Sequence, residues 1–264
     1  MKKQDAVGDK YKALEKVYRN KFESNKYLIL RLDGKAFHSF TKGMKKPFDE
    51  RLYEIFKETL KYLCENVDGV KIGYYQSDEI SLVLFNDSPK INKQYWFDNK
   101  IEKILTIATS ICTAKFNSEY NKFGQFGTKE FGFFDARGFV VDTLDEVQEY
   151  LEWRVNDSIK NSVYLYAFDK VKDNSNPTKA LMNKSVKEKI DLLKNEYGVD
   201  YYSFDSKYRK GIFYSKEYTT FVVKKEQYPQ HLKEDKIVTR RKFKLHETFD
   251  NVADIVDHFR KDWD

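Results

Sequence analysis

Apolar positions in the first third of the chain form short continuous runs separated by a stretch of helical spacing. Residues 27–32 are nearly all apolar, which is typical of a strand covered on both faces. Residues 51–65 place apolar side chains at helical spacing, with charged side chains on the opposite face. Residues 70–75 and 80–85 are two further apolar runs, and the four polar residues between them predict a hairpin. The predicted order is strand, helix, hairpin.

The following segment adds one more helix and one more strand. Residues 96–116 again show helical spacing, and residues 133–141 predict a strand. The succession βαββαβ is the ferredoxin-like arrangement, which the palm of nucleotide polymerases shares with many binding domains. We therefore expect an α+β fold in which the end of the first strand lies beside the hairpin.

Three acidic residues lie at the ends of these predicted strands. Asp33 and Gly34 close the first strand, and Asp78 and Glu79 lie in the turn of the hairpin. Carboxylates on a rigid sheet edge are the ligands that a pair of divalent ions about 4 Å apart requires for phosphoryl transfer. Asp-Gly is also a common turn dipeptide, and Ser-Asp-Glu also occurs in solvated loops, so these residues alone leave both interpretations open.

The C-terminal part begins after a polar segment, residues 172–178, that predicts a loop. We expect a catalytic palm domain at residues 1–170 and a lysine-rich C-terminal α/β extension at residues 171–264, packed on the palm. Within the extension the pattern predicts one helix and two strands, at residues 179–195, 211–223 and 237–245.

The charge of the chain is compatible with a polyanionic partner. Lysine and arginine number 48 against 42 aspartate and glutamate, a net charge of +6, and clusters such as residues 240–244 give the last quarter a basic bias. The candidate RNA contacts are Lys187, Arg209, Lys210, Arg240 and Arg241. A solvated surface carries similar residues, so charge alone leaves RNA binding open.

Cysteine usage and hydropathy bear on the cellular compartment in which the protein is expected. Cys64 and Cys112 fall on apolar helical faces, which favours reduced core thiols over a disulfide. No apolar run approaches the ~18 residues of a spanning helix, and the first residues lack the apolar region of a signal peptide. The sequence predicts no membrane association and a cytoplasmic location, with an organelle left open.

The segments around the acidic residues resemble the tRNA(His) guanylyltransferase family of 3′-to-5′ nucleotide polymerases. The likeness extends, in the same order, from about residue 5 to about residue 250, and the two carboxylate blocks are specific as motifs. The similar segments are residues 31–40, 46–47, 76–79, 134–137, 150–154 with Asp157, 208–211 and 238–240.

The resemblance implies an enzyme that adds nucleotides to the 5′ end of a tRNA. In that family ATP or GTP first activates a 5′ monophosphate. The 3′-hydroxyl of an incoming nucleoside triphosphate then attacks the activated phosphate. The implied partners are tRNA, nucleoside triphosphates and further copies of the chain in a homotetramer.

The resemblance also implies a set of site residues. Asp33, Asp78 and the carbonyl of Gly34 would hold two Mg²⁺ ions, and Glu79 would support the catalytic site. His38 is interpreted as part of the turn that orients the metal-binding loop, because the ions supply the activation that a general base would otherwise provide. The implied nucleotide-binding residues are Asp33, Gly34, Lys35, Ala36, Phe37, His38, Lys46, Ser77, Asp78, Lys103 and Asn161.

Two departures from the family pattern bear on the substrate. Residues 159–165 stand where enzymes specific for tRNA(His) carry His-Ile-Asn-Asn-Leu-Tyr-Asn, and only Asn161 and Tyr164 match. Phe48 replaces the asparagine that usually follows Lys-Pro. Both departures favour the guanylyltransferase-like branch, which repairs or edits truncated tRNA 5′ ends, over a strict tRNA(His) guanylyltransferase that adds G at position −1.

Two further classes of protein remain open at this point. A nucleotide cyclase shares the palm and the metal pair, but it would form a cyclic product from GTP alone. A non-catalytic RNA-binding homologue would tolerate loss of its carboxylates. Because all three carboxylates are present, we expect an active enzyme.

Overall fold

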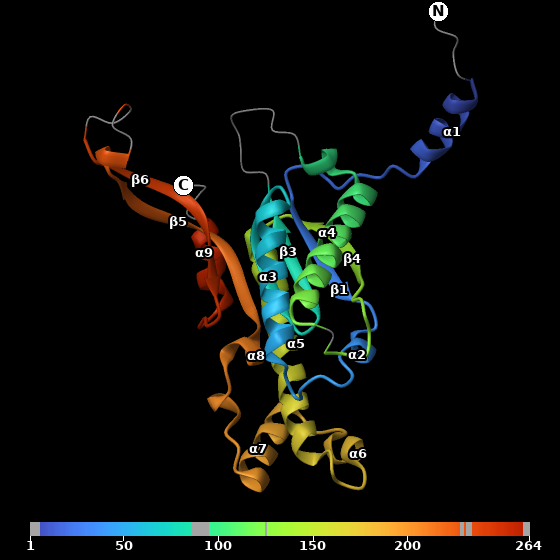
Figure 1. Ribbon diagram of the computed structural model, residues 1–264, viewed down its shortest axis with the longest axis vertical. Helices are drawn as coiled ribbons and strands as arrows, with labels where there is room; N and C mark the ends of the chain where they lie inside the picture. Colours follow the sequence, from blue (N-terminus) through green and yellow to red (C-terminus); the bar gives the residue numbers. More distant parts are fainter. Residues whose placement is uncertain (1–5, 86–94, 125, 228–229, 231–233, 261–264) are drawn as a thin grey trace, which may run out of the picture.

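Strands from both halves of the chain form one antiparallel sheet in the computed structural model, which describes residues 6–85, 95–124, 126–227, 230 and 234–260 (Figure 1). The strand order is β4-β1-β3-β2-β5-β6. The strands are β1 (Tyr27–Gly34), β2 (Val70–Gln76), β3 (Glu79–Leu84), β4 (Phe134–Val141), β5 (Ile212–Val223) and β6 (Lys236–His246). The helices are α1 (Ala6–Val17), α2 (Phe37–Phe40), α3 (Glu50–Asn66), α4 (Ile101–Lys122), α5 (Leu144–Val171), α6 (Pro177–Leu181), α7 (Val186–Tyr197), α8 (Ser206–Lys210) and α9 (Val252–Arg260). Single 3₁₀ turns lie at Trp96–Asn99, Tyr201–Ser203 and Lys225–Gln227.

The first four strands confirm the predicted palm. Their succession with α3 and α4 is βαββαβ, and their spatial order is that of a ferredoxin-like sheet. The antiparallel pairing of β1 with β3 brings the C-terminal end of β1 to the turn of the β2–β3 hairpin. This pairing places the predicted acidic residues at one end of the sheet.

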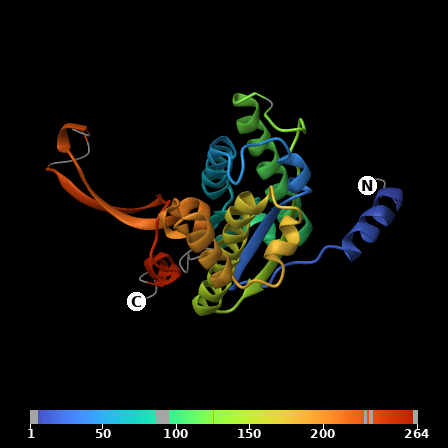
Figure 2. The same cartoon turned by 90° about the horizontal axis from the view of Figure 1, so that it is seen from below.

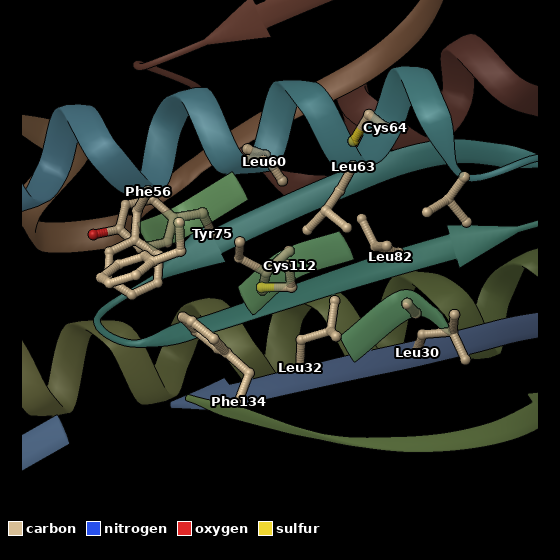
Figure 3. Close-up of a cluster of buried hydrophobic side chains, with 14 of the residues drawn as sticks. Leu30, Leu32, Phe56, Leu60, Leu63, Cys64, Tyr75, Leu82, Cys112 and Phe134 are labelled. Atoms are coloured by element: carbon tan, nitrogen blue, oxygen red, sulfur yellow. The ribbon is translucent and has the colours of Figure 1, made fainter. Parts of the chain in front are cut away.

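Each face of the sheet carries its own hydrophobic core because side chains alternate along a strand. Leu28, Leu30 and Leu32 of β1 point toward α3 and α4 and join the cluster drawn in Figure 3, in which Cys64 and Cys112 are buried thiols. The opposite face, which includes Tyr27 and Ile29, packs against α5 and α9. The palm is therefore a sheet between two helical layers.

Helix α5 is longer than the sheet face that it crosses. It begins at a capping box in which Thr143 and Glu146 exchange hydrogen bonds, and its second half carries a third core that α6 and α7 complete. Figure 1 shows α6 and α7 below the sheet at the end of α5. This third cluster positions α8, which returns the chain toward the acidic end of the sheet.

Two predicted helices begin or end differently from the sequence pattern. Residues 96–99 form a 3₁₀ turn in which Phe97 and Asp98 have positive φ, so α4 starts only at Ile101. The helix predicted at residues 179–195 is two helices, because Asn183 has a φ of 61° and Ser185 caps a new helix. The spacing of apolar residues alone does not reveal such interruptions of a helix.

The C-terminal strands extend the palm sheet. The strands predicted at residues 211–223 and 237–245 are confirmed as β5 and β6, and β5 pairs with β2. The outer half of the β5–β6 hairpin projects from the body on one side, and α1 projects on the other (Figure 2). The division of the chain at residue 170 stays a prediction.

Candidate active site at the hairpin tip

The end of β1 and the turn of the β2–β3 hairpin are joined by their backbones. The N–H of Gly34 donates to the carbonyl of Asp78 at 3.0 Å, and Asp33 lies opposite Glu79 in the strand register. The two acidic segments are therefore neighbours in space, as the predicted strand order requires.

The Asp78 carboxyl lies in an environment that disfavours its ionised form. Partial burial, followed by the nearby Asp33 carboxylate, raises the pKa of Asp78 to about 6. Asp33 itself has a side chain that is 37% exposed, and Arg137 approaches it only to 3.8 Å. The hydroxyl of Ser77 donates to Asp78 at 3.1 Å. Two hard anionic oxygen donors at one edge are the ligand chemistry that a divalent cation such as Mg²⁺ prefers.

The third carboxylate, Glu79, points away from this edge into the protein. Its side chain accepts two hydrogen bonds from Arg154 of α5, from Nε at 2.7 Å and from Nη2 at 2.6 Å. Burial raises the pKa of Glu79, and the Arg154 guanidinium opposes that rise. Across the described ranges, no group of three or more His, Cys, Asp or Glu side chains is arranged to hold a metal ion. A cation here has two carboxylates and backbone oxygens available.

The loop after Asp33 folds tightly because of two residues with special backbone requirements. A Cβ at Gly34 would lie 2.3 Å from the ring of Phe37, so only glycine fits there. Ala36 has a φ of 55° and begins the short helix α2. Phe37 and Phe40 are buried in the core, whereas His38 is exposed. Two buried aromatic anchors therefore hold the loop and leave His38 at the surface.

A pocket of about 330 Å³ opens beside the hairpin tip. It contains five of the predicted nucleotide-binding residues: Phe37, His38, Lys46, Ser77 and Asp78. Its other lining residues include two further lysines and three aromatic side chains, Lys45, Lys207, Phe48, Tyr53 and Tyr208. Phe48 and Tyr208 are stacked with ring centroids 4.7 Å apart. Lysine ammonium groups and aromatic faces next to an acidic edge suit a nucleotide with its phosphates.

Six predicted nucleotide-binding residues are not among those that line this pocket. Asp33, Gly34 and Ala36 belong to the adjoining end of β1 and the loop before α2, and the other three are Lys35, Lys103 and Asn161. Lys103 lies at the first turn of α4, at the opposite end of the sheet, in a hollow that Glu15 and Arg19 also line. Asn161 is exposed on α5, and its side chain donates to Asp157 at 3.3 Å. Lys35 has an exposed side chain, and its N–H donates to the Phe133 carbonyl. The structure therefore does not bring Lys103 together with the acidic edge of the same chain.

The predicted RNA contacts fall in three separate places. Lys187 is exposed on α7. Arg209 and Lys210 on α8 donate to the backbone carbonyls of Phe204 and of Phe249 and Asp250, respectively. Arg240 and Arg241 lie on β6 of the projecting hairpin, over the rings of Phe221 and Tyr218.

Sequence reasoning missed the roles of several residues near the site. The sequence pattern places Arg154 only within a similar segment, although the one arginine among the mostly apolar positions of the buried α5 face is a signal for a buried ion pair. Asp49 caps α3 and is bound by the guanidinium of Arg51. Arg31 lies 3.8 Å from Glu79, a contact that only the strand register reveals.

The sheet, its acidic tip and the lysine-lined pocket define a palm-type protein of the nucleotidyltransferase class. A family model described as tRNAHis guanylyltransferase matches residues 8–142, and one described as Thg1 C terminal domain matches residues 145–257. The chain belongs to the tRNA(His) guanylyltransferase family, whose members are nucleotidyltransferases. The predicted family and the prediction of an enzyme of this kind are confirmed.

Individual relatives are similar over most of the chain. The tRNA(His) guanylyltransferase of Candida glabrata is 30% identical over 211 residues, which cover 74% of this chain and 86% of that protein. A bacterial tRNA(His) guanylyltransferase (Thg1)-like protein in complex with ATP is 31% identical with a TM-score of 0.79, over 97% of this chain and 99% of that one. The corresponding GTP complex is 31% identical with a TM-score of 0.75, over 98% of this chain and 99% of that one.

Among the helices that the structure describes, none is long and apolar enough to cross a bilayer. The cytoplasmic location stays a prediction.

Proposed function

We propose that the chain adds nucleotides to the 5′ end of truncated tRNA in the 3′-to-5′ direction. The observation that carries this proposal is the pairing of Asp33 with the Ser77–Asp78 turn through the Gly34–Asp78 hydrogen bond, directly beside the lysine-lined pocket. The relatives described as complexes with ATP and GTP support nucleoside triphosphates as substrates of this chain.

Two Mg²⁺ ions at Asp33, Asp78 and the Gly34 carbonyl would neutralise charge on the reacting phosphates and lower the pKa of the attacking hydroxyl. The donor set fits such ions, because the carboxylates of Asp33 and Asp78 lie close enough to interact electrostatically at this edge and Asp78 is partly buried. Lys46 and Lys45 would bind the triphosphate, and the Phe37-anchored loop would hold its phosphates close to the acidic edge.

The reaction would have two parts. The 5′ monophosphate of the RNA would first attack ATP or GTP, releasing pyrophosphate and forming an activated 5′ end. The 3′-hydroxyl of a second nucleoside triphosphate would then attack that activated phosphate, and the activating nucleoside monophosphate would leave. The role of the chain is to position these groups and exclude water, as is general for phosphoryl transfer.

Repair of truncated tRNA is favoured over addition of G at position −1 by the altered segment of α5. Asn161 is exposed and bound to Asp157, and Tyr164 packs on Phe168, so the two matching residues serve contacts within the helix. The names of the curated relatives favour the second candidate, a tRNA(His) guanylyltransferase.

The test is incorporation of labelled nucleotides with Mg²⁺ and all four triphosphates. A tRNA lacking its first 5′ nucleotide is compared with full-length tRNA(His). We expect the templated nucleotide to be added to the truncated tRNA. Addition of a single G to full-length tRNA(His) alone would support the second candidate, and no incorporation into either RNA would reject both. A cyclic product from GTP alone would instead identify a cyclase.

The proposed oligomer is a homotetramer, as the family resemblance implies. Sedimentation of the chain with and without tRNA measures its mass directly. A monomer in both conditions would reject the tetramer.

A further inference from the structure

An arginine pair lies next to the acidic edge, on the sheet face that α5 covers. Arg31 of β1 stands directly opposite Arg137 of β4, and Asp33 stands opposite Asp135 two residues further along. Because side chains alternate along a strand, all four point to the same face. The arginine pair is therefore one step along the sheet from the proposed reaction site.

Like charges directly opposite each other on neighbouring strands are destabilising unless a counter-charge lies between them. Glu79 is 3.8 Å from Arg31, but its carboxylate already accepts two hydrogen bonds from Arg154. Arg137 is 3.8 Å from Asp33 and 3.5 Å from Asp135, distances longer than a charge-assisted hydrogen bond. The arginine pair therefore retains the capacity to bind an anion.

An exposed tryptophan lies beside Arg31 of this pair. Trp153 of α5 is 52% exposed, and the guanidinium groups of Arg154 and Arg31 lie 4.4 Å and 5.9 Å from its ring centroid. Tyr150 packs edge-on against both Trp153 and Phe139, at centroid distances of 5.9 Å and 5.4 Å. Phe139 is also exposed. We call the surface formed by Arg31, Arg137, Phe139 and Trp153 the arginine–tryptophan shelf.

We propose that the arginine–tryptophan shelf binds an unpaired RNA end, with a base stacked on Trp153 and its phosphate held by Arg31 and Arg137. This combination of aromatic faces and cations is what single-stranded nucleic acid requires. A second copy of the chain is disfavoured as the occupant, because it would have to bury two like-charged guanidinium groups. The inference rests on the proposed function, since a truncated 5′ end leaves the opposing 3′ strand unpaired next to the reaction site.

The shelf is tested by binding rather than turnover. A labelled RNA hairpin with a recessed 5′ monophosphate and an unpaired 3′ overhang is compared with a blunt hairpin of the same stem. Trp153→Ala is expected to weaken binding of the overhang RNA about 5- to 150-fold and to leave the blunt RNA unchanged. Trp153→Phe should restore most of the affinity, because a phenyl ring also stacks.

Tyr62→Ala is the matched control. Tyr62 is also an exposed ring with a cation over it, Lys115 at 5.1 Å, but it lies on α3, which covers the opposite face of the sheet. The Tyr62→Ala protein should bind both RNAs as the wild type does. Thermal unfolding of each variant establishes that the fold is intact.

The outcomes separate this inference from the proposed function. Equal weakening of both RNAs by Trp153→Ala, or no weakening at all, would overturn the shelf even if nucleotides are incorporated. If Trp153→Ala changes the sedimentation mass of the protein but leaves its preference for the overhang RNA unchanged, the shelf is an interface between copies of the chain. That result would also overturn the inference. If the protein prefers the overhang RNA through Trp153 but incorporates no nucleotide into any RNA, the shelf is supported and the repair activity is rejected.

Discussion

Arg154 and Glu79 form a buried ion pair that ties helix α5 to the strand leaving the hairpin tip, with Nε–Oε1 and Nη2–Oε2 distances of 2.7 Å and 2.6 Å. Only 5% of Glu79 and 6% of Arg154 is exposed. Asp78, the residue before Glu79, is thereby fixed relative to α5. The pair explains why one acidic residue of the hairpin faces the interior while its neighbour faces the pocket.

Removing one partner of this pair should be costly. Arg154→Met leaves the Glu79 carboxylate buried without its two hydrogen bonds and with only Arg31, 3.8 Å away, as a counter-charge. We expect a loss of about 3–5 kcal/mol in the free energy of unfolding, measured by urea denaturation. The double variant Arg154→Met with Glu79→Gln should recover part of that loss, because a neutral amide is cheaper to bury than a carboxylate. A loss below about 1 kcal/mol for the single variant would show that the pair does not hold the hairpin.

Asp78→Asn should separate activity from stability. The substitution removes a carboxylate that burial and Asp33 both disfavour, so the midpoint of thermal unfolding should be unchanged or higher. Nucleotide incorporation should fall about 100-fold or more, because a cation ligand is lost. Mg²⁺ should raise the unfolding midpoint of the wild type more than that of the variant.

The matched control for Asp78 is Asp135→Asn, at the same end of the sheet on β4. It should retain most of the incorporation activity, since Asp135 is not among the proposed ligands. Near-normal turnover of the Asp78→Asn protein would reject the assignment of the acidic edge.

Lys46 and Lys103 are both predicted from the sequence to bind the nucleotide, but substitution of each should affect KM differently. Lys46 lines the pocket, whereas Lys103 lies at the far end of the sheet. Lys46→Ala should raise the KM for the nucleoside triphosphate about 10- to 100-fold, because one charge-assisted phosphate contact is lost. Lys103→Ala should leave that KM within about twofold if each site is built from one chain. A large effect of Lys103→Ala would place Lys103 in the site of a neighbouring copy.

Asp49 should give the fold a pH-dependent increment of stability. Burial tends to raise the pKa of Asp49, but hydrogen bonds from Arg51 and from the N–H groups of Lys45 and Arg51 hold the pKa below the usual 3.8. The folded protein therefore binds this proton less readily than the unfolded chain. The stabilisation is fully present above the unfolded pKa and is lost as pH falls through the folded one.

Asp49→Asn measures that increment. The amide still caps α3, but it loses the charge, so the variant should be about 1–2 kcal/mol less stable at pH 7. The difference should shrink as the pH falls below about 4, as followed by urea unfolding at each pH. A difference that is independent of pH would mean that the carboxylate charge contributes nothing.

Much of the palm follows from patterns that are local in the chain. The continuous apolar runs before Gly34 and on either side of the hairpin turn predict the strands. A short apolar run of this kind is typical of a strand that is covered on both faces. The helical stripe of α3 is equally clear, with Leu60 and Leu63 in the core. The boundaries of α4 and the break between α6 and α7 depend on residues with positive φ, which apolar periodicity does not reveal.

The sequence by itself determined the βαββαβ order, the family and the two acidic segments, because each is written in spacing and residue type over short stretches. Tertiary structure alone decided that Glu79 turns inward to Arg154, that Lys103 lies away from the pocket, and that Arg31 faces Arg137 across the sheet. These relationships depend on strand register and on the helix packed over each face. Register and packing are set by the whole core, whose contacts join residues far apart in the chain.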